Sequence, residues 1–217
     1  ETARRDTGTG LLERGVYYED AEREFTEGIP QEIAFVDMGF LKYFDQKGGA
    51  DVGNDALKLA ADLMEKAVEK SGTDGTVYRY AGDEFVIRFS GESGQMERFK
   101  TALEELRKAA GPVPPGKSGT RDGYVPSELV FNIGASDSDA VDGVFGTLKE
   151  MGQYSEEELA DPEFVANTKA ELLTMSADVG IERPKAEHRF ALLIEMKRNP
   201  NADPQHVADL VTYSDKA

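Results

Sequence analysis

Two adjacent carboxylates, Asp83 and Glu84, stand in the middle of a stretch that otherwise favours β-structure. The flanking runs, residues 77–80 and 85–87, are rich in β-branched and aromatic side chains, and Gly82-Asp83 is a common turn pair. The stretch is therefore typical of a β-hairpin with an acidic tip. Because an unpaired buried charge is costly, carboxylates at such a tip either face water or hold a cation. Taken alone, an acidic turn is more often a solvated loop.

A further carboxylate, Asp37, stands near the end of an apolar run, residues 33–38. Both faces of this run are apolar, which predicts a strand in the centre of a sheet. If this strand is a neighbour of the hairpin, Asp37, Asp83 and Glu84 meet at one edge of the sheet. Carboxylate oxygens suit Mg²⁺ or Mn²⁺, and the carbonyl of Met38 could add another ligand. Such a cation, with positive groups on the phosphates, is what phosphoryl transfer requires.

The elements that would position these residues follow from periodicity and breakers. Apolar spacing predicts helices over residues 16–27, 56–68, 96–106 and 161–177, with a short last helix from residue 203. Further strands are expected at residues 129–134 and 190–196. This order indicates a single α/β domain of the α+β type over residues 1–217, a sandwich with a mostly antiparallel sheet flanked by helices. Residues 1–15 are interpreted as a lead-in, and residues 140–176 as an acidic helical insertion.

Composition limits the function further. The chain has 217 residues, a net charge of −17 and 39% hydrophobic residues. Such acidity argues against binding to nucleic acid or to anionic membranes, and it requires local cations wherever a phosphate binds. The absence of cysteine excludes disulfides and thiolate chemistry. We expect no membrane span and a cytoplasmic location, and we interpret the sequence, which lacks an initiator Met and a signal peptide, as a fragment of a longer chain.

The hairpin residues Ala81-Gly82-Asp83-Glu84-Phe85 resemble the signature of the GGDEF domains, the bacterial diguanylate cyclases, whose fold is a ferredoxin-type sandwich like that of nucleotide cyclases. Three other blocks occur in the family's order, namely residues 6–17, residues 37–57, and Ala177-Asp178 with Lys185 and Arg189 at the family's spacing. Together the four blocks cover most of the chain. The resemblance implies that two GTP molecules, one on each subunit of a homodimer, are condensed into cyclic di-GMP with Mg²⁺.

The resemblance also implies roles for individual residues. Asp37 and Asp83 match the family's metal ligands, and Glu84 matches an acid that serves catalysis. Backbone amides of Gly39, Phe40 and Leu41 would meet the phosphates. The positive charges come from residues that match the family's phosphate-binding positions: Lys42, Lys185 and Arg189.

The positions that read the base carry exchanged residue types. The family uses an Asn and an Asp, whereas this chain has Asp45 and Asn54 at those positions. Guanine offers two N–H donors and one acceptor on its pairing edge, and a carboxylate plus a carboxamide satisfies that set in either order. We therefore predict that guanine recognition is retained; the alternative is a pocket that has drifted and binds nothing.

Other departures keep a second function open. Gly39 replaces the family's second Asp, and Pro184 interrupts the helix expected to carry Lys185. Ala81 replaces a Gly that could need positive φ or close approach to phosphate. Residues 72–75 lack the Arg of the family's feedback site. The first hypothesis is an active cyclase. The second is a degenerate domain that binds a nucleotide or a partner protein without turnover, and the third is an acidic interaction module without a ligand.

Overall fold

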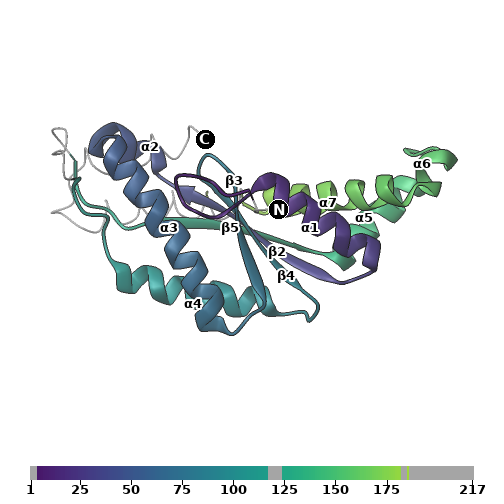
Figure 1. Ribbon diagram of the computed structural model, residues 1–217, viewed down its shortest axis with the longest axis horizontal. Helices are drawn as coiled ribbons and strands as arrows, with labels where there is room; N and C mark the ends of the chain where they lie inside the picture. Colours follow the sequence, from purple (N-terminus) through teal and green to yellow (C-terminus); the bar gives the residue numbers. More distant parts are fainter. Residues whose placement is uncertain (1–3, 117–123, 182–184, 186–217) are drawn as a thin grey trace.

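The computed structural model describes residues 4–116, 124–181 and 185. In this part of the chain, five strands form one sheet in the order β1-β3-β4-β2-β5, with helices on both faces (Figure 1). Only the β1–β3 pair is parallel. The prediction of a mostly antiparallel sheet flanked by helices is confirmed. The strands are β1 (Leu12–Glu13), β2 (Gln31–Gly39), β3 (Gly75–Ala81), β4 (Glu84–Ser90) and β5 (Val130–Asp137).

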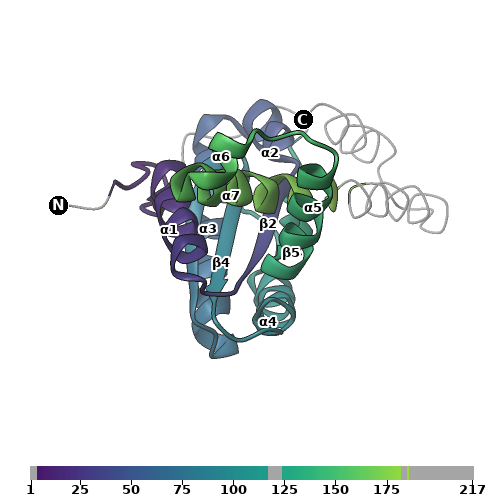
Figure 2. The same ribbon diagram turned by 90° about the vertical axis from the view of Figure 1, so that its right-hand side faces the viewer.

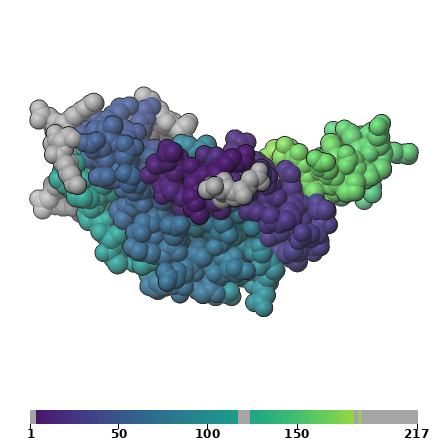
Figure 3. All heavy atoms as spheres, viewed as in Figure 1, coloured from purple at the N-terminus to yellow at the C-terminus, as the bar shows by residue number. Residues whose placement is uncertain are grey.

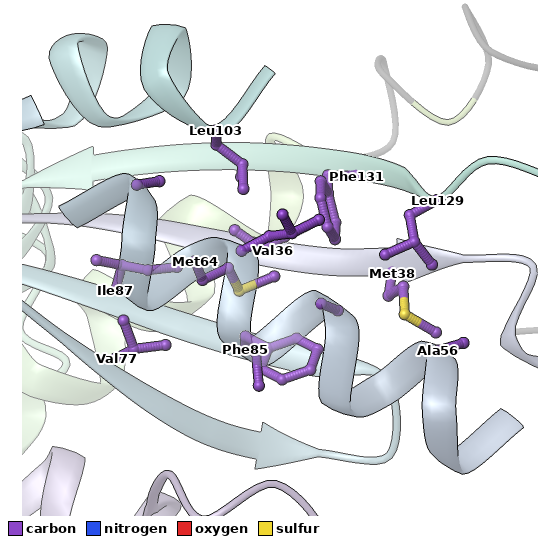
Figure 4. Close-up of a cluster of buried hydrophobic side chains, with 14 of the residues drawn as sticks. Val36, Met38, Ala56, Met64, Val77, Phe85, Ile87, Leu103, Leu129 and Phe131 are labelled. Carbon is purple, nitrogen blue, oxygen red and sulfur yellow. The ribbon is translucent and has the colours of Figure 1, made fainter. Parts of the chain in front are cut away.

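The central strand β2 is buried because both of its faces are covered by helices. Side chains from Ala34, Val36 and Met38 lie in the cluster formed with α3 and α4, whereas Ile33 and Phe35 lie in the cluster formed with α1 and α7. Figure 4 shows Val36 and Met38 in the first cluster. This is the alternation that an apolar run on a strand produces when neither face meets water. The helical elements are α1 (Arg14–Glu27), α2 (Leu41–Tyr43), the π-helical turn η1 (Phe44–Gly48), α3 (Ala50–Ser71), α4 (Gln95–Ala110), α5 (Ser138–Glu150), α6 (Glu156–Ala160) and α7 (Pro162–Val179).

Helix α7 has a larger structural role than the sequence indicated. It begins as predicted, with Pro162 in the first turn and the Asp161 carboxylate accepting a hydrogen bond from the N–H of Glu163. However, α7, most of which was interpreted as part of an acidic helical insertion, buries an Ala- and Leu-rich stripe on the sheet. It crosses β5 so closely that a Cβ on Gly134 would lie 1.8 Å from the carbonyl oxygen of Ala177. In the described part of the chain, the α5–α6 end, with the start of α7, projects from the body (Figure 3).

Several predicted boundaries differ from the structure. Helix α3 begins at Ala50 instead of residue 56, because its polar first turns hide the apolar periodicity. Within the predicted lead-in, β1 pairs with β3 and extends the sheet. The strand expected at residues 190–196 and the helix expected from residue 203 lie outside the described residues. None of the helices described is long and apolar enough to cross a membrane.

Candidate functional site

The site is built on one row of residues across the sheet. Asp37 on β2 lies directly opposite Glu84 on β4 and Asn132 on β5. Because opposite residues of antiparallel strands share a face, these three side chains lie on the face that α1 and α7 cover (Figure 2). Asp37 is 5% exposed, and its Oδ1 accepts a hydrogen bond of 2.9 Å from Asn132 Nδ2. The strand register therefore fixes the position of this carboxylate.

The hairpin tip is tied to the same strand. Ala81 pairs with Glu84, so the turn consists of Gly82 and Asp83, and the carbonyl of Asp83 accepts a hydrogen bond of 2.8 Å from the N–H of Met38. The prediction that the strands of Asp37 and the hairpin are neighbours is confirmed. Gly82 takes the positive φ of +40°, whereas Ala81 lies in the strand. The expectation that Ala81 could need positive φ was therefore wrong, because the turn begins one residue later.

Lys185, predicted to contact the phosphates, lies beside the Asp37 carboxylate. Its Nζ is 3.2 Å from Oδ2 of Asp37. Its backbone N–H donates a hydrogen bond to the carbonyl of Ile181, which follows the end of α7. The side chain of Lys185 is 17% exposed. Arg189, its expected partner on the phosphates, lies outside the described residues.

The carboxylates repel one another. The pKa of Asp83 is raised by burial and then by the charge of Asp37, although Lys185 partly opposes this. The pKa of Glu84 is raised by burial and by the charges of Asp83 and Asp178. A cation placed among these groups would relieve both effects, so the electrostatics favour cation binding at this edge.

A divalent cation fits the chemistry of this donor set. Carboxylate oxygens are hard ligands of the kind that Mg²⁺ and Mn²⁺ prefer, and the ammonium of Lys185 pairs with one of them, Oδ2 of Asp37. No group of three or more acidic or histidine side chains in the described ranges could hold a metal by itself. Asp37 and Asp83 would therefore need further oxygens, such as the Met38 carbonyl, water or substrate phosphates.

The loop after β2 has an unusual backbone. Phe40 adopts φ 69° and ψ 15°, and it is the one described non-glycine residue with positive φ. This conformation costs about 1–2 kcal/mol and persists here because the ring is buried in the core between the sheet and α3. It turns the chain sharply from Gly39 into α2, where Leu41 is half-buried and Lys42 is exposed. The structure thus forms a tight loop where phosphate binding was predicted.

The two predicted base readers lie at one corner of the molecule. Asp45 stands in η1 and Asn54 in α3, and both are exposed. Oδ1 of Asp45 is only 1.7 Å from the place that a Cβ on Gly53 would occupy, so the carboxylate rests on the α3 backbone next to Asn54. Partial burial of the Asp45 carboxyl group raises its pKa, although the residue as a whole is exposed.

Sequence reasoning missed three features near the tip. Asn132 holds Asp37, and Asp178 adds charge beside Glu84. Beside the hairpin, a cavity of about 390 Å³ is lined by residues that include Arg14 and Arg79, whose guanidinium groups stack on aromatic rings. The strand pairing of Asn132 with Asp37 left no local signal in the sequence, although its place in a predicted strand was visible.

Comparison with known proteins agrees with the geometry. A family model described as "Diguanylate cyclase, GGDEF domain" matches residues 3–118. Similar solved structures include the GGDEF domain of TpbB, or YfiN, from Pseudomonas aeruginosa (16% identity, TM-score 0.57, covering 85% of this chain and 90% of that one). A sensory box/GGDEF family protein from Caulobacter crescentus has 20% identity and a TM-score of 0.54, covering 85% of this chain and 99% of the other.

A third similar structure is the coiled coil and GGDEF domain of DgcB from Caulobacter crescentus, which was solved in complex with c-di-GMP. It has 19% identity and a TM-score of 0.50, and the match covers 61% of this chain and 68% of that one. At these identities the structures establish a shared fold. No curated protein matches the sequence.

Proposed function

Because the chain belongs to the GGDEF family of diguanylate cyclase domains, we propose that it condenses two GTP molecules into cyclic di-GMP at a homodimer interface. The observation that carries the proposal is the register of β2 and β4, which places Asp37 opposite Glu84 and next to the hairpin tip. In the reaction, each 3′-hydroxyl oxygen attacks the α-phosphorus of the other GTP. The bond to pyrophosphate breaks, so two GTP give one cyclic di-GMP and two pyrophosphates.

Asp37 and Asp83, with the Met38 carbonyl, would hold Mg²⁺ or Mn²⁺. The bound cation would offset negative charge on the phosphates. Glu84 is suited to accept the proton of the attacking hydroxyl, because its raised pKa makes the carboxylate a stronger base. Asn132 would hold Asp37 in its rotamer through the hydrogen bond to Oδ1.

The residues around the site would bind the phosphates and the base of GTP. Backbone amides of the Gly39–Leu41 loop and the side chain of Lys42 would contact the phosphates, with Lys185 and Arg189 as further positive charges. Asp45 and Asn54 would read the guanine edge, which needs both acceptors and a donor. The c-di-GMP bound to DgcB supports a guanine nucleotide as the ligand class.

A degenerate binding domain is the second candidate, and a specific observation favours it. Gly39 offers no carboxylate, and Lys185 already pairs with the Asp37 carboxylate that would hold metal. Such a domain would bind GTP, or a partner protein, without turnover.

Incubation with GTP and Mg²⁺, followed by chromatography of the products, separates the two functions. The cyclase proposal requires pyrophosphate and cyclic di-GMP in a 2:1 ratio, and their loss in the Asp37→Asn variant. Binding of GTP without either product, at protein concentrations high enough for dimers to form, would support the degenerate domain.

A further inference from the structure

Each oxygen of the Asp37 carboxylate already has a partner. Oδ1 accepts from Asn132 Nδ2 at 2.9 Å, and Oδ2 lies 3.2 Å from Lys185 Nζ. Asp37 and Asn132 are 5% and 4% exposed, so water takes little part in satisfying this carboxylate. Asp37 is therefore neutralised by a protein cation in the absence of metal.

Lys185 is well placed to be displaced. Its ammonium lies beside a cluster of carboxylates that carries more negative charge than one ammonium can neutralise. Asp83 and Glu84 also interact electrostatically with Lys185. A lysine ammonium and a divalent cation repel each other strongly at contact distance, so both cannot remain on the same buried carboxylate oxygen. The lysine has a flexible four-carbon stem, and its ammonium can move while its backbone stays bonded to Ile181.

We infer that Lys185 is a built-in counter-cation that occupies Asp37 in the metal-free domain and leaves it when a divalent cation binds. This inference rests on the proposed metal site. Metal binding then breaks the ion pair between Lys185 and Asp37. A nucleotide phosphate can pair with the released ammonium. Metal and nucleotide are therefore coupled through one side chain, and each raises the affinity for the other.

The first test is calorimetric titration of the nucleotide-free chain with Mn²⁺. We expect Lys185→Met to bind Mn²⁺ at least about tenfold more tightly than the parent, whereas Lys185→Arg, which keeps the charge, does not gain affinity. Lys169→Met is the matched control, because Lys169 is a partly buried lysine that pairs with a carboxylate outside the site, the exposed Asp142, at 2.7 Å. It should leave Mn²⁺ affinity unchanged. Adding a GTP analogue with a non-hydrolysable α–β bridge should raise Mn²⁺ affinity more in the parent than in Lys185→Met.

The second test needs no variant. Acetylation of the parent chain with acetic anhydride, read by mass spectrometry, should label Lys185 faster with Mg²⁺ than without it, while Lys169 labelling stays constant. Two results would overturn the inference and leave the proposed function standing. One is equal Mn²⁺ affinity of the parent and Lys185→Met. The other is a rate of Lys185 labelling that does not change with Mg²⁺ although the chain binds Mg²⁺. If neither the parent nor the variant binds Mn²⁺, both the inference and the metal-dependent function fail.

Discussion

Asp37 and Glu84 lie directly opposite each other on the antiparallel strands β2 and β4. Strand register therefore sets their spacing, and no loop has to close to bring them together. The same register places Asn132 on the other side of Asp37, where it holds one carboxylate oxygen. A rigid sheet edge of this kind is a precise support for groups that act on one ligand.

The first prediction concerns metal binding by Asp37. Asp37→Asn keeps the side-chain shape but removes the charge, so it should weaken Mn²⁺ binding at least about tenfold, because hard divalent cations depend on carboxylate charge. Calorimetric titration measures this. Asp142→Asn, which removes an exposed carboxylate from a pair with Lys169, should bind Mn²⁺ like the parent. Unchanged affinity in Asp37→Asn would place the metal elsewhere.

The second prediction concerns the carboxylate that Gly39 lacks. A Cβ on Gly39 would lie 3.4 Å from Val130 and 3.5 Å from Asn132 Nδ2, which is ordinary van der Waals contact. Gly39 lies two residues beyond Asp37 on the same face of β2, so Gly39→Asp adds a second carboxylate beside the first. We expect tighter Mn²⁺ binding by about tenfold and, for an active cyclase, faster product formation. Gly39→Asn, of equal size and no charge, is the control. If both variants behave alike, charge at this position is unimportant.

The third prediction concerns the base. Asp45→Ala should reduce the preference for GTP over ATP more than Asn54→Ala, because a carboxylate that accepts two N–H donors makes the stronger bonds. Gly53→Ala should act like Asp45→Ala, since its Cβ would occupy the place of the Asp45 carboxylate. Competition binding with GTP and ATP measures the preference. Equal affinity of the parent for both nucleotides would contradict a guanine pocket.

The fourth prediction concerns pH and stability without metal. The pKa of Asp83 in the folded protein lies above its unfolded value of 3.8, chiefly through burial and the charge of Asp37. The native state therefore holds this proton more tightly, and its stability falls as pH rises through that window and stays lower above it. Asp83→Asn should raise the free energy of unfolding at pH 7 by roughly 0.5 kcal/mol, after discounting for solvent screening.

The same substitution should give no gain at about pH 3, where Asp83 is protonated in both states. Denaturant unfolding at the two pH values, with chelator present, measures the difference. Glu105→Gln is a control of opposite sign, because its pairing with Lys70 lowers the pKa of Glu105. This variant should not gain stability at pH 7. A gain for Asp83→Asn at both pH values would show that charge is not the cause.

Sequence predicted the parts of the fold that local pattern determines. Strand β2 followed from its apolar run, and the hairpin followed from Gly82-Asp83 between β-rich segments. Helix α7 was predicted in extent, but its burial was missed, because the small residues that contact the sheet stand among acidic ones and look like a solvated face. Whether a helix face is buried depends on the element that packs against it, and the sequence of the helix alone does not identify that element.

The site was predictable in its residue types and less so in its contacts. That Asp37 meets Asn132 depends on the register of β5, and that it meets Lys185 depends on where α7 ends over the sheet. Neither leaves a local mark in the sequence. Ala81 was misjudged because a motif does not say which of its residues form the turn; the pairing of Ala81 with Glu84 decides that.

The last prediction concerns activity and dimerisation. Each subunit would hold one of the two reacting GTP molecules, so productive geometry needs two domains face to face. A net charge of −17 on each chain opposes that approach, especially at low salt. Fusion to a parallel dimeric coiled coil raises the effective concentration of the second domain and should increase cyclic di-GMP formation at least about tenfold. Liquid chromatography of the products measures it.

Two variants of the fused dimer complete this test. Glu84→Gln should abolish product, because it removes the proton acceptor. Ala81→Gly should leave the rate nearly unchanged, because Ala81 lies in strand β3 and Gly82 takes the positive φ; it should only lower stability by about 0.5–1 kcal/mol. The fused dimer could bind GTP and Mg²⁺ but make no product, and Gly39→Asp could fail to restore product formation. In that case the domain lacks the chemical step, and the approach of the two subunits is not what limits it. The domain would then be a nucleotide-binding member of its family without turnover.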